Sequence, residues 1–175
     1  MTIRNYTRGD AAEVLRLWNT AGAQTMGYAP QSAGGLDALL LRHPDFSEKH
    51  SFVLTDADGV RGFVSGVTGD ALAQGRVRGY FSCLLLDPAA DSDENTALLL
   101  AALEDSFRAA GKSVAAVTCF NPVRLPWIIP STDGHQHNNM PGIPTDTALY
   151  RRMLALGWVE ATTEQAMHLD LSGFQ

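Results

Sequence analysis

The stretch Tyr80–Gly111 constrains the fold of this chain more than any other. It opens with an apolar run to Leu86, which predicts a buried strand, and an Asp-Pro pair then stops that strand. An acidic turn follows, and then a helical pattern that ends at Gly111. Its apolar face is marked by Leu99, Leu100, Leu103 and Phe107. A strand that feeds a helix through a tight turn directs free backbone N–H groups and the positive end of the helix dipole toward one point, which favours an anion. Here that point carries the carboxylates of Asp91, Asp93 and Glu94.

The composition is that of one globular domain covering residues 1–175. At 175 residues the chain is long enough to bury a core. Its 45% apolar and 18% charged residues are typical of globular proteins. No apolar run approaches the ~20 residues of a membrane span, and the N-terminus lacks a signal-peptide stretch, so we expect a cytoplasmic protein. A net charge of −6 argues against nucleic-acid binding and favours a cationic small molecule or peptide amine as partner. Cys83 and Cys119 lie in apolar runs and are expected to be buried thiols.

The first half of the chain predicts two helices and four strands. Asp10, with Glu13 three residues later, is typical of an N-cap with a capping box, and the first helix ends at Gly22. A short helix is expected over Leu36–Arg42. Alternating apolar residues predict the strands Thr2–Tyr6, Ser51–Thr55, Val60–Val67 and Tyr80–Leu86.

The second half predicts a strand at Val114–Phe120 and a last helix that begins at Thr145 or Asp146 and ends at Leu156. Between them lies the long segment Asn121–Thr145 with five prolines, a length typical of a functional lid, an interface element or a disordered insertion. The strands Trp158–Glu160 and Ala166–Leu171 close the chain. The order β-α-α-β-β-β-α-β-α-β-β indicates a mixed, mostly antiparallel α+β sheet with helices on both faces.

This order of elements resembles the GNAT (GCN5-related) N-acetyltransferase superfamily over nearly the whole chain. The pieces that carry the resemblance are the N-terminal strand and helix, the strand that ends in Leu86-Asp87-Pro88, and the ending Leu154–Trp158. The resemblance implies an acyl-CoA N-acyltransferase fold and an enzyme that moves an acetyl group from acetyl-CoA to a small-molecule or peptide amine by direct attack.

The resemblance also implies where acetyl-CoA would bind. It would lie where the strands Tyr80–Leu86 and Val114–Phe120 part, with its pyrophosphate at the N-terminus of the next helix. Asn121, at the end of the second strand, is a further cofactor contact by position, and an Asn-Pro turn explains it equally well. The remaining cofactor-binding candidates are the backbone of Cys83, Leu84 and Leu85, and the turn residues Asp91, Ser92, Asp93, Glu94, Asn95 and Thr96.

The turn departs from the family's pattern, Arg/Gln-x-x-Gly-x-Gly/Ala, because Asp91, Glu94 and Thr96 occupy its defining positions. Carboxylates there would repel a pyrophosphate dianion, and no Lys or Arg lies between Arg78 and Arg108 to offset them. Ser92 or Asp93 would also serve as a strong N-cap. Two alternatives therefore stay open. In the first, the turn is a modified cofactor loop. In the second, the helix caps itself, and the chain is a catalytically impaired GNAT-fold binding or structural domain that does not use acetyl-CoA; a homodimer is one option for it.

Proton transfer has three candidate side chains. The tyrosine that the family often uses to protonate the departing thiolate is replaced by Met153, and Tyr150, almost one helical turn away, is a substitute. His135 and His137 are candidates because the unperturbed pKa of histidine is ~6.5; catalysis, substrate contact or a solvated polar loop would each explain them. Two histidines without a cysteine or a firm third ligand make a weak metal site, and no metal is predicted.

Overall fold

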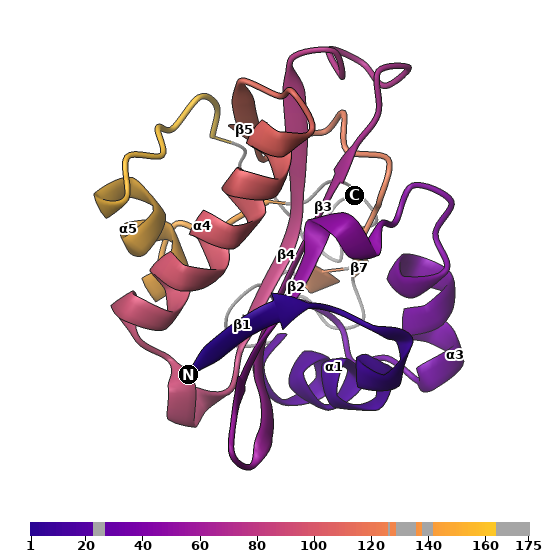
Figure 1. Ribbon diagram of the computed structural model, residues 1–175, viewed down its shortest axis with the longest axis vertical. Helices are drawn as coiled ribbons and strands as arrows, with labels where there is room; N and C mark the ends of the chain where they lie inside the picture. The colour runs from indigo at the N-terminus through magenta and orange to yellow at the C-terminus, as the bar shows by residue number, and fades with distance from the viewer. Residues whose placement is uncertain (23–26, 126, 129–135, 138–141, 164–175) are drawn as a thin grey trace, which may run out of the picture.

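The computed structural model describes residues 1–22, 27–125, 127–128, 136–137 and 142–163, and its centre is a five-stranded sheet (Figure 1). The strands lie in the order of the chain, and β5 is parallel to β4 while all other pairs are antiparallel. This confirms the mixed, mostly antiparallel sheet predicted from the sequence. The strands are β1 (Thr2–Asn5), β2 (Ser51–Asp56), β3 (Gly59–Thr68), β4 (Arg78–Leu86) and β5 (Val114–Ala116).

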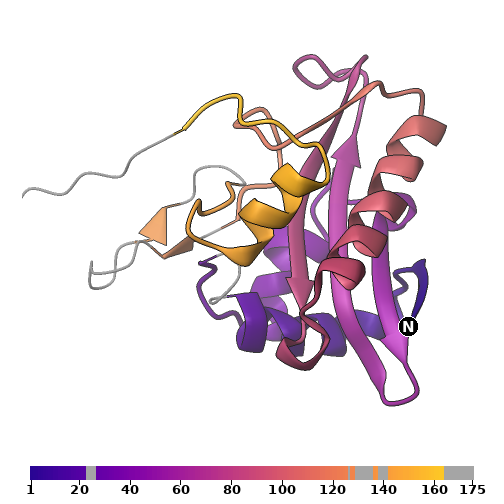
Figure 2. The same cartoon turned by 90° about the vertical axis from the view of Figure 1, so that its left-hand side faces the viewer.

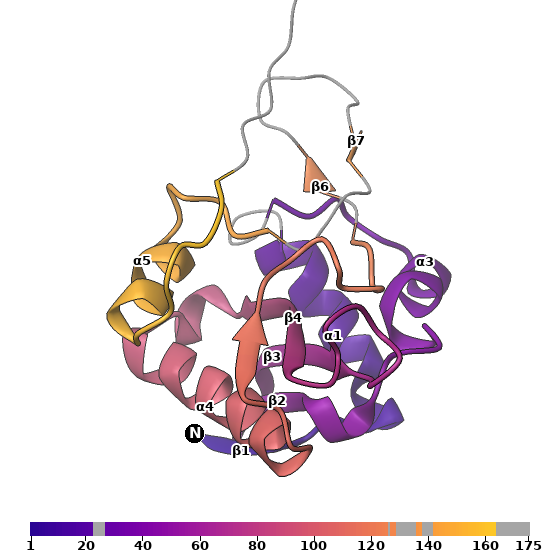
Figure 3. The same ribbon diagram turned by 90° about the horizontal axis from the view of Figure 1, so that it is seen from above.

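Helices cover both faces of the sheet, as Figures 2 and 3 show. The long helix α4 packs across one face, with α5 beside it, while α1 and α3 lie on the other. Short segments η1 (Arg8–Asp10), η4 (Glu48–His50) and η5 (Pro88–Ala90) join the main elements, and β6 (Trp127–Ile128) pairs with β7 (Gln136–His137). The helical segments are α1 (Ala11–Leu17) with η2 (Trp18–Gly22), α3 (Ala33–Leu36) with η3 (Asp37–Leu41), α4 (Asp93–Ala109) and α5 (Ala148–Ala155).

The strand β4 forms the middle of the core. Every residue from Gly79 to Leu86 is buried, so both faces of this strand are covered by helices. The predicted apolar face of α4 is confirmed, because its side chains pack into the same core. These side chains are Leu99, Leu100, Leu103 and Phe107.

Two predicted strands differ from the structure. The strand expected over Val114–Phe120 ends at Ala116, because the chain leaves β4 there. Cys119 is consequently exposed, while Cys83 is buried as expected. The stretch Trp158–Glu160 is irregular instead of extended, and the Trp158 side chain anchors it by donating from Nε1 to Glu104 at 2.9 Å. The stretch 166–171 lies outside the described residues.

One predicted helix cap was wrong, and the other is confirmed in position but not in its bonds. Asp10 is the N-cap residue of α1, but its side chain makes no capping hydrogen bond there. Its Oδ2 instead accepts from the backbone N and Oγ1 of Thr7, at 2.8 and 2.9 Å, and Thr7 is the N-cap of η1. The hydrogen bond from the Arg4 guanidinium lowers the pKa of Asp10 to about 2. Burial acts in the opposite direction, and the bonds from Thr7 lower the pKa further. The last helix is capped by Thr147, whose Oγ1 accepts from the Tyr150 N–H at 3.2 Å.

The close approach of α4 to the sheet depends on a missing side chain at Gly66. A Cβ there would lie 2.6 Å from the Phe107 ring and 2.7 Å from the backbone oxygen of Tyr80. We therefore expect Gly66→Ala to lower the free energy of unfolding by about 1–3 kcal/mol, as overpacking does. Gly34→Ala is the control, since no atom lies within 4 Å of its Cβ position and Ala favours a helix. Urea denaturation of both variants checks this, and equal stabilities would contradict it.

A neutral histidine is buried between α4 and the sheet. Ser106 Oγ donates to the Leu103 oxygen at 2.7 Å, so it accepts from Nδ1–H of His50 at 3.0 Å, and Nε2 accepts from Thr68 Oγ1 at 2.9 Å. Burial, with Lys49 and Lys112 adding to it, lowers the pKa of His50 below its usual value. The folded protein therefore binds this proton less readily than the unfolded chain.

Stability should accordingly fall in weak acid. The contribution of His50 is complete above pH ~6.5 and is lost as the pH falls, because the unfolded chain takes up the proton first. The low pKa of Asp10 contributes only to losses below about pH 4, so the two windows are separate. We expect a lower free energy of unfolding at pH 5.5 than at 7.5, and a smaller difference in His50→Gln. The same pH dependence in both proteins would exclude this role.

Candidate functional site

The parallel strands β4 and β5 separate after only three residue pairs. Arg78, Gly79 and Tyr80 lie opposite Val114, Ala115 and Ala116, and β5 then ends while β4 continues to Leu86. In the described part of the chain no strand pairs with β4 on this side beyond Tyr80. This opening, which we name the β4–β5 opening, leaves a backbone edge of β4 without a partner among the described strands. The edge includes Cys83, Leu84 and Leu85, which were singled out in the sequence and which are at most 2% exposed.

A bulge in β4 marks the start of the opening. Ser65 lies opposite Cys83 and Gly66 opposite Phe81, so Ser82 is the extra residue. The Tyr28 hydroxyl donates to the Ser82 carbonyl at 3.2 Å, and burial raises the pKa of Tyr28 so that it stays protonated. Sequence reasoning missed Tyr28, because it lies within the Gly-, Pro- and Ser-rich link Gly27–Gly35, where no pattern indicates what its side chain contacts.

Asn121 joins the chain that leaves β5 to the same bulge. Its Nδ2 donates to the Phe81 carbonyl at 2.9 Å and to Ser82 Oγ at 3.0 Å, while its Oδ1 accepts from the Val123 N–H at 2.9 Å. The residue is 1% exposed. Its polar atoms are thus engaged within the protein, which supports the turn-forming interpretation over a side-chain contact with a cofactor.

The N-terminus of α4 lies directly after this strand and is capped by its own residues. Ser92 Oγ accepts from the Asn95 N–H at 3.2 Å, so Ser92 is the N-cap, and the alternative cap Asp93 is not. The side chains of Asn95 and Thr96 are buried in the turn: they donate to the carbonyls of Ala90 and Ser92, each at 2.8 Å. The self-capping predicted from the sequence is present.

The acids of this turn have a cationic partner that the sequence did not reveal. Arg152 of α5 donates from Nε to Asp93 Oδ1 at 2.7 Å and from Nη1 to Asp91, and Nη1 lies 3.5 Å from Thr96 Oγ1. Its side chain is 17% exposed. Arg152 lies 59 to 61 residues further along the chain, so no local pattern could have identified it. We name this group, Asp91, Asp93 and Arg152, the α4 ion-pair cluster; Glu94 is exposed beside it.

The proton-transfer candidates are not brought together by the described residues. The Tyr150 hydroxyl donates to the Glu160 carboxylate, which raises the pKa of Tyr150. Met153 is buried in the core. His137 lies on β7 opposite Trp127, and His135 lies outside the described residues. No group of three His, Cys, Asp or Glu side chains within the described ranges could hold a metal ion.

The same described ranges contain no helix that is both long and apolar enough to cross a membrane. The protein also has clear structural relatives, although no protein-family model and no curated protein matches its sequence. A transcriptional regulator from Bacillus halodurans superposes with a TM-score of 0.60 at 15% identity, over 96% of this chain and 99% of that one.

Two further similar structures are a putative acetyltransferase and an N-acetyltransferase. The Salmonella typhimurium protein YncA, a putative acetyltransferase solved with its cofactor acetyl-CoA, has a TM-score of 0.51 at 21% identity, over 65% and 66% of the two chains. The ribosomal-protein-S18-alanine N-acetyltransferase of Escherichia coli has a TM-score of 0.50 at 16% identity, over 65% and 63%. The structure therefore has the GNAT acyl-CoA N-acyltransferase fold, as predicted, and identities this low show the fold alone.

The bonds of Asn121 predict a structural effect. Asn121→Ala should lower the free energy of unfolding by about 1–3 kcal/mol, because it leaves the buried Phe81 carbonyl and the Val123 N–H without partners. Urea denaturation without any ligand measures this. Asn19→Ala is the control, since it removes comparable side-chain bonds to Gln31 at an exposed position. A loss in Asn121→Ala no larger than in the control would contradict the tethering role.

Proposed function

We propose that this chain, which has the GNAT fold, transfers an acetyl group from acetyl-CoA to the amine of a small molecule or peptide. The observation that carries the proposal is the β4–β5 opening: the parallel pair parts after Tyr80, and the free edge of β4 leads straight to the N-terminus of α4. Open α/β sheets bind their ligands at such strand ends. YncA of Salmonella typhimurium, a structural relative solved with its cofactor acetyl-CoA, has the same fold, which supports this choice of donor.

The free edge of β4 suits the acyl end of acetyl-CoA. Backbone N–H and C=O groups at Cys83, Leu84 and Leu85 can pair with an extended amide chain as a neighbouring strand would. A backbone N–H can also stabilise negative charge on a carbonyl oxygen during attack by a neutral amine. Burial raises the pKa of the Cys83 thiol, so that side chain contributes packing and not a nucleophile. Acetyl-CoA supplies the thioester that the amine attacks.

The phosphate end of the site is a partial fit. Within the described residues, the backbone N–H groups of Asp93 and Glu94 have no acceptor, so two first-turn donors are available to an anion. Arg152 adds a cation at the same place but is held by Asp91 and Asp93. A pyrophosphate would bind here by replacing these carboxylates as the partner of Arg152. Ser92, Asn95 and Thr96 would shape the turn.

Proton transfer in this proposal falls to Tyr150 or to the loop histidines His135 and His137. Tyr150 carries its proton in the folded protein, and its bond to Glu160 would have to be exchanged for one to the leaving thiolate. The histidines would accept a proton from the amine near neutral pH.

A second function is favoured by the α4 ion-pair cluster and by Met153. Ser92 caps the helix, Arg152 forms ion pairs with Asp91 and Asp93, and Met153 is buried in the core. All these features would also suit a GNAT-fold binding or structural domain that has lost catalysis and does not use acetyl-CoA.

Acetyl-CoA binding separates the two functions. If the folded state binds acetyl-CoA, a thermal-shift titration should raise the Tm, since ligand at ~100 times its Kd adds roughly 2.7 kcal/mol of stability. Asp93→Ala should keep or tighten this binding, by up to about tenfold, because it removes a like charge and releases Arg152. No shift at millimolar acetyl-CoA would exclude the enzyme and leave the binding domain.

The matched control is Asp105→Ala. Asp105 is an exposed acid on the same helix, paired with Arg108 and far from its N-terminus. Its removal should change the acetyl-CoA affinity less than about twofold. An equal gain in both variants would mean that net charge alone, and not the α4 ion-pair cluster, opposes the anion.

A further inference from the structure

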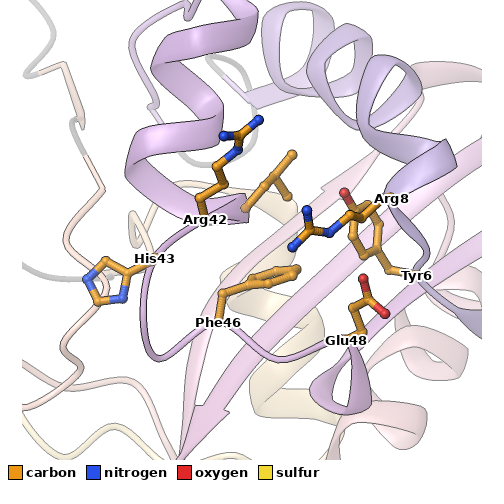
Figure 4. A pocket seen from close by; sticks show the side chains of 7 residues that line it. Tyr6, Arg8, Arg42, His43, Phe46 and Glu48 are labelled. Atoms are coloured by element: carbon orange, nitrogen blue, oxygen red, sulfur yellow. The ribbon is translucent and has the colours of Figure 1, made fainter.

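We propose that a second pocket, at the opposite edge of the sheet, binds a small zwitterion with an apolar side chain, such as a free α-amino acid. The pocket has a volume of about 460 Å³, within the ~300–1,000 Å³ of typical ligand sites. Figure 4 shows its lining, which comes from the residues after β1, the end of η3 and the loop into η4. The residues are Tyr6, Arg8, Leu41, Arg42, His43, Phe46 and Glu48.

The first observation is a buried hydroxyl without a partner. Tyr6 is 2% exposed, its ring packs edge-on against Phe46 and Phe63, and among the described residues its hydroxyl makes no hydrogen bond. Buried hydroxyls are normally paired, and this one lines the pocket and points to the same space as the Arg8 guanidinium (Figure 4). A ligand carboxylate would give it an acceptor.

The second observation is a pair of opposite charges that do not neutralise each other. Arg8 and Glu48 both line the pocket, yet within the described residues neither side chain forms an ion pair with the other or with a third group. Both charges act on the pKa of the Tyr6 hydroxyl, which is raised to about 12. Burial and the charge of Asp10 are the main causes, Glu48 adds to the increase, and Arg8 opposes it. Arg42 is different, because Asp37 already holds it at 2.8 Å.

These groups together select the ligand. Arg8 and Tyr6 offer donors to a carboxylate, Glu48 offers an acceptor to an ammonium group, and Phe46 and Leu41 provide an apolar wall. A simple anion would leave Glu48 unpaired and close to a like charge. A simple cation would do the same to Arg8. A zwitterion offers a partner of opposite charge to each of the two side chains.

The site is separate from the β4–β5 opening. Tyr6 follows β1, which is the first strand of the sheet, while the opening lies between the last two strands in the order β1-β2-β3-β4-β5. A molecule bound at Tyr6 would therefore not contact the backbone of Cys83–Leu85. The inference is independent of the acetyltransferase proposal.

Binding to the full chain tests the site in the absence of acetyl-CoA. We expect L-phenylalanine to shift backbone NMR signals of Tyr6 and Phe46 saturably below about 10 mM. L-phenylalaninamide, which lacks the carboxylate, and N-acetyl-L-phenylalanine, which lacks the ammonium group, should each bind at least about tenfold more weakly. Inorganic phosphate should bind no more tightly than these two.

Variants locate the site. Arg8→Gln and Glu48→Gln should weaken L-phenylalanine binding at least about tenfold, and Tyr6→Phe at least about threefold, while Arg108→Gln on α4 leaves it unchanged. Tyr6→Phe should be at least as stable as the parent, because it removes an unpaired hydroxyl and keeps the ring. The proposal is overturned if no saturable binding occurs, if the blocked analogues or phosphate bind as well, or if the three variants bind like the parent.

Discussion

The short parallel pairing of β4 with β5 is the constraint on which the rest of the structure depends. β4 is buried on both faces, so packing fixes its position in the sheet. β5 pairs only with its first three residues. The backbone beyond Tyr80 must then be satisfied by other means, because buried N–H and C=O groups are rarely left unpaired. Asn121 and Tyr28 donate hydrogen bonds to the carbonyls of Phe81 and Ser82.

The α4 ion-pair cluster shows how one helix end can serve two opposing demands. Asp91 and Asp93 would repel an anion, and Arg152 would attract one, so the local charge depends on which groups pair. The Arg152 guanidinium already pairs with two carboxylates, so an incoming phosphate must compete with them. Anion affinity at α4 is therefore set by a difference between two ion pairs, and not by the helix dipole alone.

Local patterns in the sequence predicted most helices and strands, but they could not predict contacts between side chains that are far apart in the sequence. The apolar spacing of Leu99, Leu103 and Phe107 identified the buried face of α4 because helical periodicity is a local property. The bonds of Asp10 were not predicted, because an acid at N3 and an acid at the N-cap give similar local patterns, and only the bonds to Thr7 distinguish them. Arg152 could not be assigned to Asp93, since no property of either residue encodes how α5 packs on α4.

Helix α5 links the two departures from the family's pattern. Arg152 faces the N-terminus of α4, Met153 is buried in the core, and Tyr150 is held by Glu160, all within one turn of the same helix. An anion that releases Arg152 from Asp91 and Asp93 removes the ion pairs that join α5 to α4, while the burial of Met153 and Leu149 keeps the helix in place. In the proposed enzyme, the arginine that would bind the phosphate and the tyrosine that would protonate the thiolate therefore lie on the same short helix. A change of charge at the turn of α4 cannot be assessed without α5.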